Sequence, residues 1–194
     1  IINSLIKLYE LCKGSFSVII MISDYGLIFF RDRYGIRPLV YNIDNDLVSV
    51  ASETTGLHSL NYTNVENGEI CIVNKNLNVY KKKLFNYELR PCIFEYIYFA
   101  RPESIINDIL VYNFREKVGE FMIDIIGKEI LSEIDIIVPI PVTSMISSTV
   151  ISNKINKPLV HAVFKNRYTH RTFINYGEKI LENIKTVSYT HLTL

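Results

Sequence analysis

Short apolar runs alternate with turn residues along the first half of the chain, a pattern that predicts an antiparallel β-meander. Residues 16–23 form an apolar run rich in β-branched side chains, Asp24-Tyr25-Gly26 is a turn signal, and residues 27–31 return as a second strand. The same pattern predicts further strands at residues 38–41, 47–51, 69–73 and 79–84. Between them, Ser52 is expected to cap a short helix that extends to His58.

The second half changes to helical spacing. Apolar residues that recur every four positions predict a long amphipathic helix from about residue 109: Leu110, Phe114, Val118, Met122 and Ile126. Before this helix, the compact apolar run 94–100 predicts a strand. After it, residues 135–141 predict a buried parallel strand, followed by a hydroxyl-rich loop, a helix at about 147–155 and a strand that begins at Pro158.

The two patterns predict a mixed α/β fold, of the α+β kind, with two domains. We expect an antiparallel sheet in residues 1–86 and a βαβ unit in residues 87–194. A chain of 194 residues can hold one domain or two small ones. Because 48% of the residues are apolar, the chain has enough material for packed cores, which excludes disorder.

Charge and cysteine content exclude several classes of partner. The chain has 21 Lys and Arg against 20 Asp and Glu, so it shows no electrostatic footprint for nucleic acid or a membrane surface. Residues 136–153 carry no charge, but two prolines and six hydroxyl side chains favour a strand and loop over a membrane span. Three cysteines without close spacing indicate neither a disulfide framework nor a zinc site, and a cytoplasmic setting is expected.

Two segments carry polar side chains suited to phosphate. Thr143 and Ser144 follow the predicted strand at the start of a helix, where hydroxyls and backbone amides suit pyrophosphate or hydrated magnesium, although they also suit simple helix capping. The second segment combines cations with an aromatic ring, in Lys165, Arg167, Tyr168 and Arg171. It favours phosphate recognition, while a solvated basic strand or an RNA contact would have the same composition.

Residues 31–39 form the densest cluster of special side chains, for which we predict a structural role. Asp32 is expected to accept hydrogen bonds from turn amides, and Gly35 provides a permissive backbone. Arg37 is expected to pair with Glu53 or with another carboxylate. The cluster therefore predicts a rigid, salt-bridged corner of the sheet.

Three segments together resemble a known family. Phe30-Arg-Asp-Arg-Tyr-Gly-Ile-Arg-Pro-Leu39 with Ala51-Ser-Glu53 resembles the later strands of type II glutamine amidotransferases. Cys92-Ile-Phe-Glu-Tyr-Ile-Tyr-Phe-Ala-Arg-Pro-Glu-Ser104 and Lys165-Asn-Arg-Tyr-Thr-His-Arg-Thr-Phe-Ile174, with Val138-Pro-Ile-Pro-Val-Thr-Ser144 between them, are similar to the glutamine phosphoribosylpyrophosphate amidotransferase family. The resemblance runs from about residue 13 to residue 174. The first segment alone is equally similar to asparagine synthetase B.

The resemblance implies part of an N-terminal-nucleophile glutaminase sheet, followed by the opening of a type I phosphoribosyltransferase fold. Members of the family hydrolyse glutamine with an N-terminal cysteine and pass the ammonia to phosphoribosylpyrophosphate. The products are phosphoribosylamine, pyrophosphate and glutamate, in the first committed step of de novo purine synthesis. The resemblance further implies magnesium as cofactor, purine nucleotides as feedback inhibitors and a homo-oligomeric, cytoplasmic enzyme.

The resemblance also implies roles for individual residues. Thr143 matches the position that contacts magnesium, although the preceding residue, commonly acidic in the family, is Val142 here. The segment that lines the nucleotide phosphate pocket is matched by Lys165, Arg167, Tyr168 and Arg171. Cys92 matches a ligand of the iron–sulfur cluster found in some members. Other members keep a cysteine there without a cluster, and the remaining ligands would lie beyond residue 194, so cluster binding is left open.

The chain departs from the family at both ends. Residue 1 is Ile1, so the catalytic cysteine is absent from this chain, and the phosphoribosylpyrophosphate loop of the family is not reached. Residues 187–194 do not resemble the family and look foreign. We therefore expect an internal fragment that is inactive alone. Two alternatives are a non-catalytic regulatory protein that senses purines or phosphoribosylpyrophosphate, and an amidotransferase of the asparagine synthetase B type.

Overall fold

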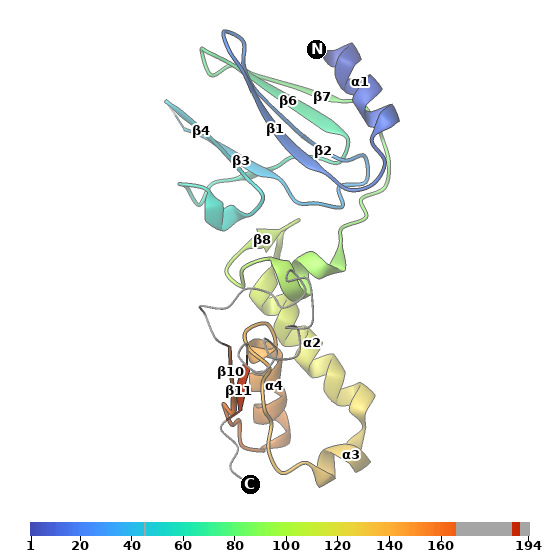
Figure 1. Cartoon of the computed structure of the whole chain (residues 1–194), viewed down its shortest axis with the longest axis vertical. Coiled ribbons are helices and arrows are strands. Elements are labelled where there is room, and N and C mark those ends of the chain that lie inside the picture. Colours follow the sequence, from blue (N-terminus) through green and yellow to red (C-terminus); the bar gives the residue numbers. More distant parts are fainter. Residues whose placement is uncertain (45, 166–187, 191–194) are drawn as a thin grey trace, which may run out of the picture. The chain divides into compact units, whose positions relative to one another are not determined.

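The computed structural model of the chain describes residues 1–44, 46–165 and 188–190 (Figure 1). By its internal contacts the chain divides into two compact units, Ile1–Tyr112 and Asn113–Leu194. Compactness does not identify catalytic domains, so the assignment of residues 1–86 and 87–194 to two such domains stays a prediction. Within the described ranges, no helix is long and apolar enough to cross a membrane.

The first unit contains two antiparallel sheets and one long helix. Its helix α1 spans Ile2–Leu11. The larger sheet has the order β1-β2-β6-β7, with β1 at Ser17–Ile22, β2 at Gly26–Arg31, β6 at Glu69–Asn74 and β7 at Val79–Lys83. The smaller sheet has the order β4-β3-β5, with β3 at Val40–Asp44, β4 at Leu47–Ala51 and β5 at Thr63–Asn64. A short hairpin of β8 (Ile105–Ile106) and β9 (Ile109–Leu110) follows.

Alternation along β2 and β6 gives the larger sheet two apolar faces. Ile28 and Phe30 of β2 pack with Leu5 and Tyr9 of α1, which covers one face (Figure 1). The intervening Phe29 points to the opposite face, where a second cluster joins the two sheets: Phe29, Leu39, Tyr41, Val65, Cys71 and Val73. Because successive side chains of a strand point to opposite faces, α1, the larger sheet and the smaller sheet stack as three layers.

The predicted corner after β2 is built around the carboxylate of Asp32, which is fully buried. Its oxygens accept hydrogen bonds from the backbone amides of Tyr34 at 2.9 Å, Ile36 at 2.9 Å and Arg37 at 3.3 Å. Gly35, between them, has a φ of +61°, and a Cβ there would lie 2.7 Å from the side chain of Leu89. This geometry confirms the predicted roles of Asp32 and Gly35.

Arg31, the neighbour of Asp32, is a buried cation held mainly by carbonyl groups. Its guanidinium donates to the carbonyl oxygens of Val65 at 3.0 Å and Gly35 at 2.5 Å. Burial lowers the pKa of Arg31, since taking the charge out of water disfavours the protonated form. The hydroxyl of Tyr9 donates to the Arg31 carbonyl at 2.5 Å, and burial raises the pKa of this tyrosine. Arg31 thus connects β2 to two loops and α1.

The structure corrects two predictions in the first unit. Residues 94–100 do not form a strand: Glu95–Phe99 is a π-helix, in which the Ala100 amide donates to the Glu95 carbonyl at 2.9 Å. A short apolar run fits a strand and a helical turn equally well, and here it forms a helical turn in which Glu95 and Tyr96 are buried. The helix expected to begin at Ser52 is a single 3₁₀ turn at Thr54–Gly56, preceded by Glu53.

The described part of the second unit is mainly helical. It contains α2 (Val111–Ile126), which begins at the end of the first unit, α3 (Lys128–Glu133) and α4 (Met145–Ile155). The predicted long helix and the helix near 147–155 are therefore confirmed. Gly119 allows α2 and α4 to approach, because a Cβ at this position would lie 2.7 Å from the Ser147 carbonyl oxygen. The Ser147 hydroxyl also donates to the Arg115 carbonyl at 2.7 Å.

The buried parallel strand predicted at 135–141 is reduced to one parallel bridge between Ile137 and Leu159. Pro139 and Pro141 have no backbone N–H to donate to a ladder, and Ile140 is exposed. The parallel direction was predicted correctly, but the extent and burial were wrong. Downstream, β10 (Val163–Lys165) pairs antiparallel with β11 (Ser188–Thr190).

Asp32→Asn should lower the free energy of unfolding by about 2 kcal/mol, because an amide nitrogen would replace one oxygen that accepts from backbone amides. Urea unfolding followed by circular dichroism would show a lower midpoint. Asp46→Asn, at an exposed turn, makes the same change in charge and should alter the free energy by less than about 0.5 kcal/mol. Equal effects of the two variants would contradict the role given to the Asp32 acceptor.

We expect copies of the chain to self-associate through strand β1. This strand lies at the edge of the larger sheet, and its side chains Ile19 and Met21 are 48% and 82% exposed. Met21→Lys should reduce association at micromolar concentration without loss of structure, as a charge on an edge strand opposes pairing between copies. Light scattering measures the effect. Leu60→Lys adds the same charge at a loop residue that is 98% exposed. If Leu60→Lys suppressed association as much as Met21→Lys, the change in net charge, and not the β1 edge, would explain the effect.

Candidate functional site

The loop before α4 presents the hydroxyls of Thr143 and Ser144, the predicted phosphate or magnesium loop. Ser144 occupies the N-cap position of α4, but its hydroxyl donates to the Ile140 carbonyl at 2.6 Å and makes no cap bond to the helix. Thr143 is half-buried in a turn, and its hydroxyl has no hydrogen-bond partner among the described residues. The alternative that these hydroxyls cap the helix is therefore wrong for Ser144, and no described residue bonds to the Thr143 hydroxyl.

The basic segment predicted to bind phosphate begins at Lys165, the last residue of β10. Lys165 is exposed and makes no ion pair within the described part of the chain. The other three members of this predicted set, Arg167, Tyr168 and Arg171, lie outside the described residues. The phosphate pocket thus stays a prediction.

The parallel bridge relates the Thr143 loop to Lys165. Ile137 donates its amide to the Pro158 carbonyl at 2.8 Å, and Val160 donates to the Ile137 carbonyl at 2.9 Å. Because the two segments run parallel, the residues that follow Ile137 and those that follow Leu159 leave the bridge at the same end. Ligand sites in open α/β sheets form at the carboxyl ends of parallel strands, which makes the Thr143 loop a candidate for such a site.

Cys92 is a half-buried thiol next to the Asp32 corner. Its amide donates to the Ile36 carbonyl at 3.2 Å. In the described part of the chain, no group of three or more His, Cys, Asp or Glu side chains is arranged to hold a metal. The described residues therefore give Cys92 no companion ligands for an iron–sulfur cluster.

Arg37, which ends the Asp32 corner, forms an ion pair with Glu95 of the π-helix. The Glu95 side chain is only 9% exposed and that of Arg37 is 41% exposed. The Arg37 guanidinium also lies over the Phe99 ring, 5.2 Å from its centroid. The hydrogen bond to Glu95 raises the pKa of Arg37, because it favours the protonated form. The predicted partner Glu53 is not used, and the alternative of another carboxylate is confirmed.

Glu53 instead fastens the segment that follows the π-helix. One of its carboxylate oxygens accepts from the Arg101 amide at 2.8 Å and from the Ser104 hydroxyl at 2.6 Å. Thr54 accepts from the Ile105 amide at 2.9 Å. Hydrogen bonds and one ion pair thus join the segments 30–39, 51–53 and 92–104. These are segments on which the family resemblance rests, and in the structure they contact one another.

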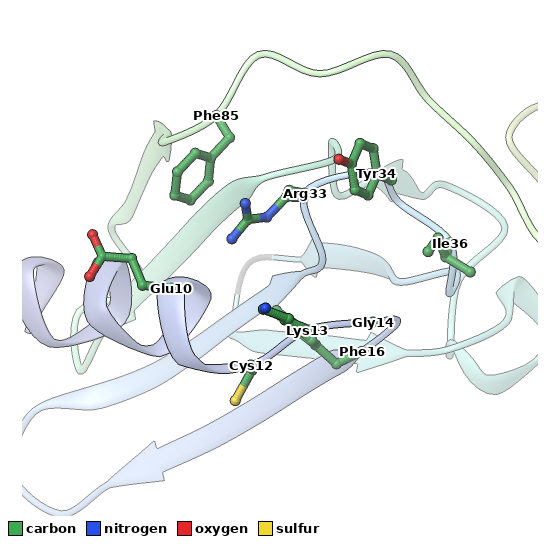
Figure 2. Close-up of a pocket in the computed structure, with 9 residues that line it drawn as sticks. All are labelled: Glu10, Cys12, Lys13, Gly14, Phe16, Arg33, Tyr34, Ile36 and Phe85. Atoms are coloured by element: carbon green, nitrogen blue, oxygen red, sulfur yellow. The ribbon is translucent and has the colours of Figure 1, made fainter.

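Sequence reasoning missed a cavity of about 520 Å³ at the end of α1 (Figure 2). Its walls come from the end of α1, the loop before β1, the Asp32 corner and Phe85. The lining residues are Glu10, Cys12, Lys13, Gly14, Phe16, Arg33, Tyr34, Ile36 and Phe85. Because these residues come from three separate stretches, no local spacing could have revealed the cavity.

Comparison with known proteins identifies relatives of the chain. A family model described as a glutamine amidotransferase domain matches residues 3–59. The amidophosphoribosyltransferase of Pseudomonas aeruginosa is 34% identical over 179 residues, which are 88% of this chain and 36% of that relative.

Solved structures agree with these relatives. Glutamine phosphoribosylpyrophosphate amidotransferase from B. subtilis, complexed with ADP and GMP, is 28% identical with a TM-score of 0.70 over 93% of this chain and 38% of that chain. A structure described as the allosteric regulatory enzyme of purine biosynthesis is 29% identical with a TM-score of 0.73, over 93% of this chain and 37% of that one. The predicted resemblance and mixed α/β fold are confirmed, and the chain spans little more than a third of the length of these relatives.

A double-mutant cycle of Arg37→Met and Glu95→Gln should give a coupling energy of about 1 kcal/mol in urea unfolding, a value kept modest because Arg37 is partly solvated. The exposed pair Lys75–Asp24, with side chains 63% and 89% exposed, is the control. Its cycle, with Lys75→Met and Asp24→Asn, should give less than about 0.5 kcal/mol. Indistinguishable coupling energies would show that the Arg37–Glu95 pair does not hold the π-helix.

Proposed function

We propose that the chain is part of a glutamine-dependent enzyme of purine synthesis, because it belongs to the amidophosphoribosyltransferase family. It corresponds to little more than a third of the length of its relatives. The intact enzyme hydrolyses glutamine and transfers the ammonia to phosphoribosylpyrophosphate, releasing phosphoribosylamine, pyrophosphate and glutamate. No residue of this chain is assigned to glutamine hydrolysis itself.

One observation carries this proposal: the match to amidophosphoribosyltransferases extends across both compact units. At 88% to 93% of the chain, the aligned part must reach beyond Tyr112, where the first unit ends. The glutamine amidotransferase model covers only residues 3–59, inside the first unit. The breadth of the match favours a two-function enzyme over an asparagine synthetase B type or a purely regulatory phosphoribosyl-binding protein.

In this proposal the second unit contributes to the phosphoribosylpyrophosphate site. The basic segment supplies cations for the phosphates, from Lys165, Arg167 and Arg171, and Tyr168 supplies a ring against the ribose or base. Such cations would hold the substrate in place and stabilise the negative charge that develops on departing pyrophosphate. Thr143, at the same end of the parallel bridge, would contact the pyrophosphate region.

Magnesium fits the Thr143 loop, because a hydroxyl without a hydrogen-bond partner among the described residues is an oxygen donor that suits a hard cation or its bound water. When bound, magnesium would neutralise charge on the phosphate oxygens. Thr143 would hold the ion or its water, and the neighbouring Ser144 keeps the loop shape through its bond to Ile140. Cys92 receives no role in this proposal, because the further ligands that a cluster would need are expected beyond residue 194.

The intact enzyme would be regulated by nucleotides and would assemble from identical subunits. The B. subtilis relative was solved with ADP and GMP, and we extend nucleotide binding at phosphate-recognising residues to this chain, with purine nucleotides as feedback inhibitors. The intact enzyme would be a cytoplasmic homo-oligomer. In the first unit, the Arg37–Glu95 and Glu53–Ser104 contacts would keep the segment before α2 in a defined position while ammonia is transferred.

Thr143→Val keeps the shape of the side chain and removes the hydroxyl that should contact magnesium or its water. The loss of one such contact should cost about 1–3 kcal/mol, or roughly 10- to 100-fold in the ammonia-dependent transferase rate. The measurement uses residues 13–174 grafted into the P. aeruginosa relative, with ammonia-dependent activity followed against magnesium concentration. Glutamine hydrolysis should change less.

Thr149→Val is the matched control for this experiment. Thr149 lies on the exposed side of α4, and its hydroxyl donates to the Met145 carbonyl at 2.9 Å within the helix. This variant should keep the transferase rate within about twofold, since its hydroxyl is already bonded within the helix and its position is exposed. If Thr143→Val also left the rate and its magnesium dependence unchanged, the assignment of the loop would be wrong.

A further inference from the structure

The cavity at the end of α1 contains no residue to which the proposed function gives a role (Figure 2). Its volume of about 520 Å³ can hold a small organic molecule, within the range of ligand pockets in proteins. All of its walls belong to the first unit, so the site does not depend on the second unit.

Arg33 supplies a positioned cation in this cavity. Its guanidinium donates to the Tyr9 carbonyl and lies over the rings of Phe85, at 5.1 Å, and Tyr87, at 5.8 Å from the centroids. Among the described residues, no carboxylate lies within ion-pair distance of Arg33. A half-buried guanidinium that is held in place but lacks an anionic partner is suited to an oxyanion ligand.

Lys13 adds a second cation without an ion-pair partner in the described part of the chain. It is exposed in the loop between α1 and β1. Glu10, at the end of α1, is the one carboxylate among the lining residues, so the lining carries one more positive than negative charge. Figure 2 shows the Cys12 thiol directed away from Arg33, so the thiol does not lie between Arg33 and a bound anion.

The remaining wall is apolar and aromatic. Phe16, Tyr34, Ile36 and Phe85 all line the cavity, and all are partly exposed. Phe16 is supported from behind by Tyr9 and Phe30, with ring centroids 5.3 and 6.1 Å away. A ligand with an organic group could therefore bury that group against rings while its anionic end meets Lys13 and Arg33.

We propose that this cavity is a binding site for a small phosphate monoester with an aromatic or other planar group. The phosphate would receive hydrogen bonds from the Arg33 guanidinium and the Lys13 ammonium. The planar group would lie against Phe85, Tyr34 and Ile36. The site is distinct from the predicted phosphate segment at Lys165 and goes beyond the proposed function.

Phenyl phosphate is a suitable probe, titrated into the complete 194-residue chain by calorimetry at low salt. Lys13→Gln should weaken its binding about tenfold, because one of two charge-assisted contacts is lost and the exposed side chain is not needed for folding. Lys7→Gln, an equal change in charge at an exposed position of α1 outside the cavity, should change binding less than about twofold.

Two further ligands separate the anionic from the apolar contribution. Inorganic phosphate should bind at least about threefold more weakly than phenyl phosphate, because it leaves the aromatic wall unoccupied. Phenol, which has the ring but no charge, should bind more weakly still. Arg33→Lys keeps the charge but loses the planar fork, so it should also weaken phenyl phosphate binding, with circular dichroism as a check of folding.

Three results would overturn the proposal. One is the absence of measurable phenyl phosphate binding up to about 10 mM, the weak limit of specific ligands. Another is an equal loss in Lys13→Gln and Lys7→Gln, which would indicate attraction by net charge alone. The third is binding of phenol as strong as that of phenyl phosphate, which would indicate an apolar pocket only. If Arg33→Lys failed to fold, the Lys13 and Lys7 variants would still decide.

Discussion

The buried carboxylate of Asp32 is the interaction on which the first unit depends most widely. Its side chain accepts from three backbone amides, its carbonyl accepts from Gly35 and Gly68 at 3.0 Å, and its amide donates to Phe16 at 2.8 Å. A carboxylate bound by several amides is stabilised without a cation, and each amide it satisfies would otherwise be costly to bury. One residue therefore holds the chain between β2 and β3 in a single conformation.

This corner directs two arginines to different partners. Arg33 is held by the Tyr9 carbonyl at the end of α1, beside a cavity, while Arg37 pairs with Glu95 in the π-helix. In a helix, two residues four positions apart are neighbours on one face, so a helix would have kept Arg33 and Arg37 together. The turn that Asp32 stabilises separates them, so one polar segment can both line a candidate anion site and fasten the chain that leads to α2.

The second unit shows how incompletely a local pattern defines a binding site. The hydroxyl of Thr143 after an apolar run correctly indicated a loop before a helix, while Lys165 lies at the end of strand β10. Only the bridge between Ile137 and Leu159 shows that both segments leave the same end of a parallel pair. That relation depends on backbone hydrogen bonds between residues more than twenty positions apart, which periodicity does not encode.

The meander from residue 16 to residue 31, the helix along α2 and the Asp32 turn could all be predicted from the sequence, because side-chain alternation, helical spacing and turn chemistry act over a few residues. The π-helix at Glu95–Phe99 could not be predicted in this way, because the same apolar run suits a strand, and the ion pair of Glu95 with Arg37 joins residues far apart in the sequence. Tertiary structure alone decided the cavity at Arg33, which exists only because α1, the corner and Phe85 meet. Contacts between segments so far apart in the sequence depend on the packing of both sheet faces, and no short stretch of sequence contains that information.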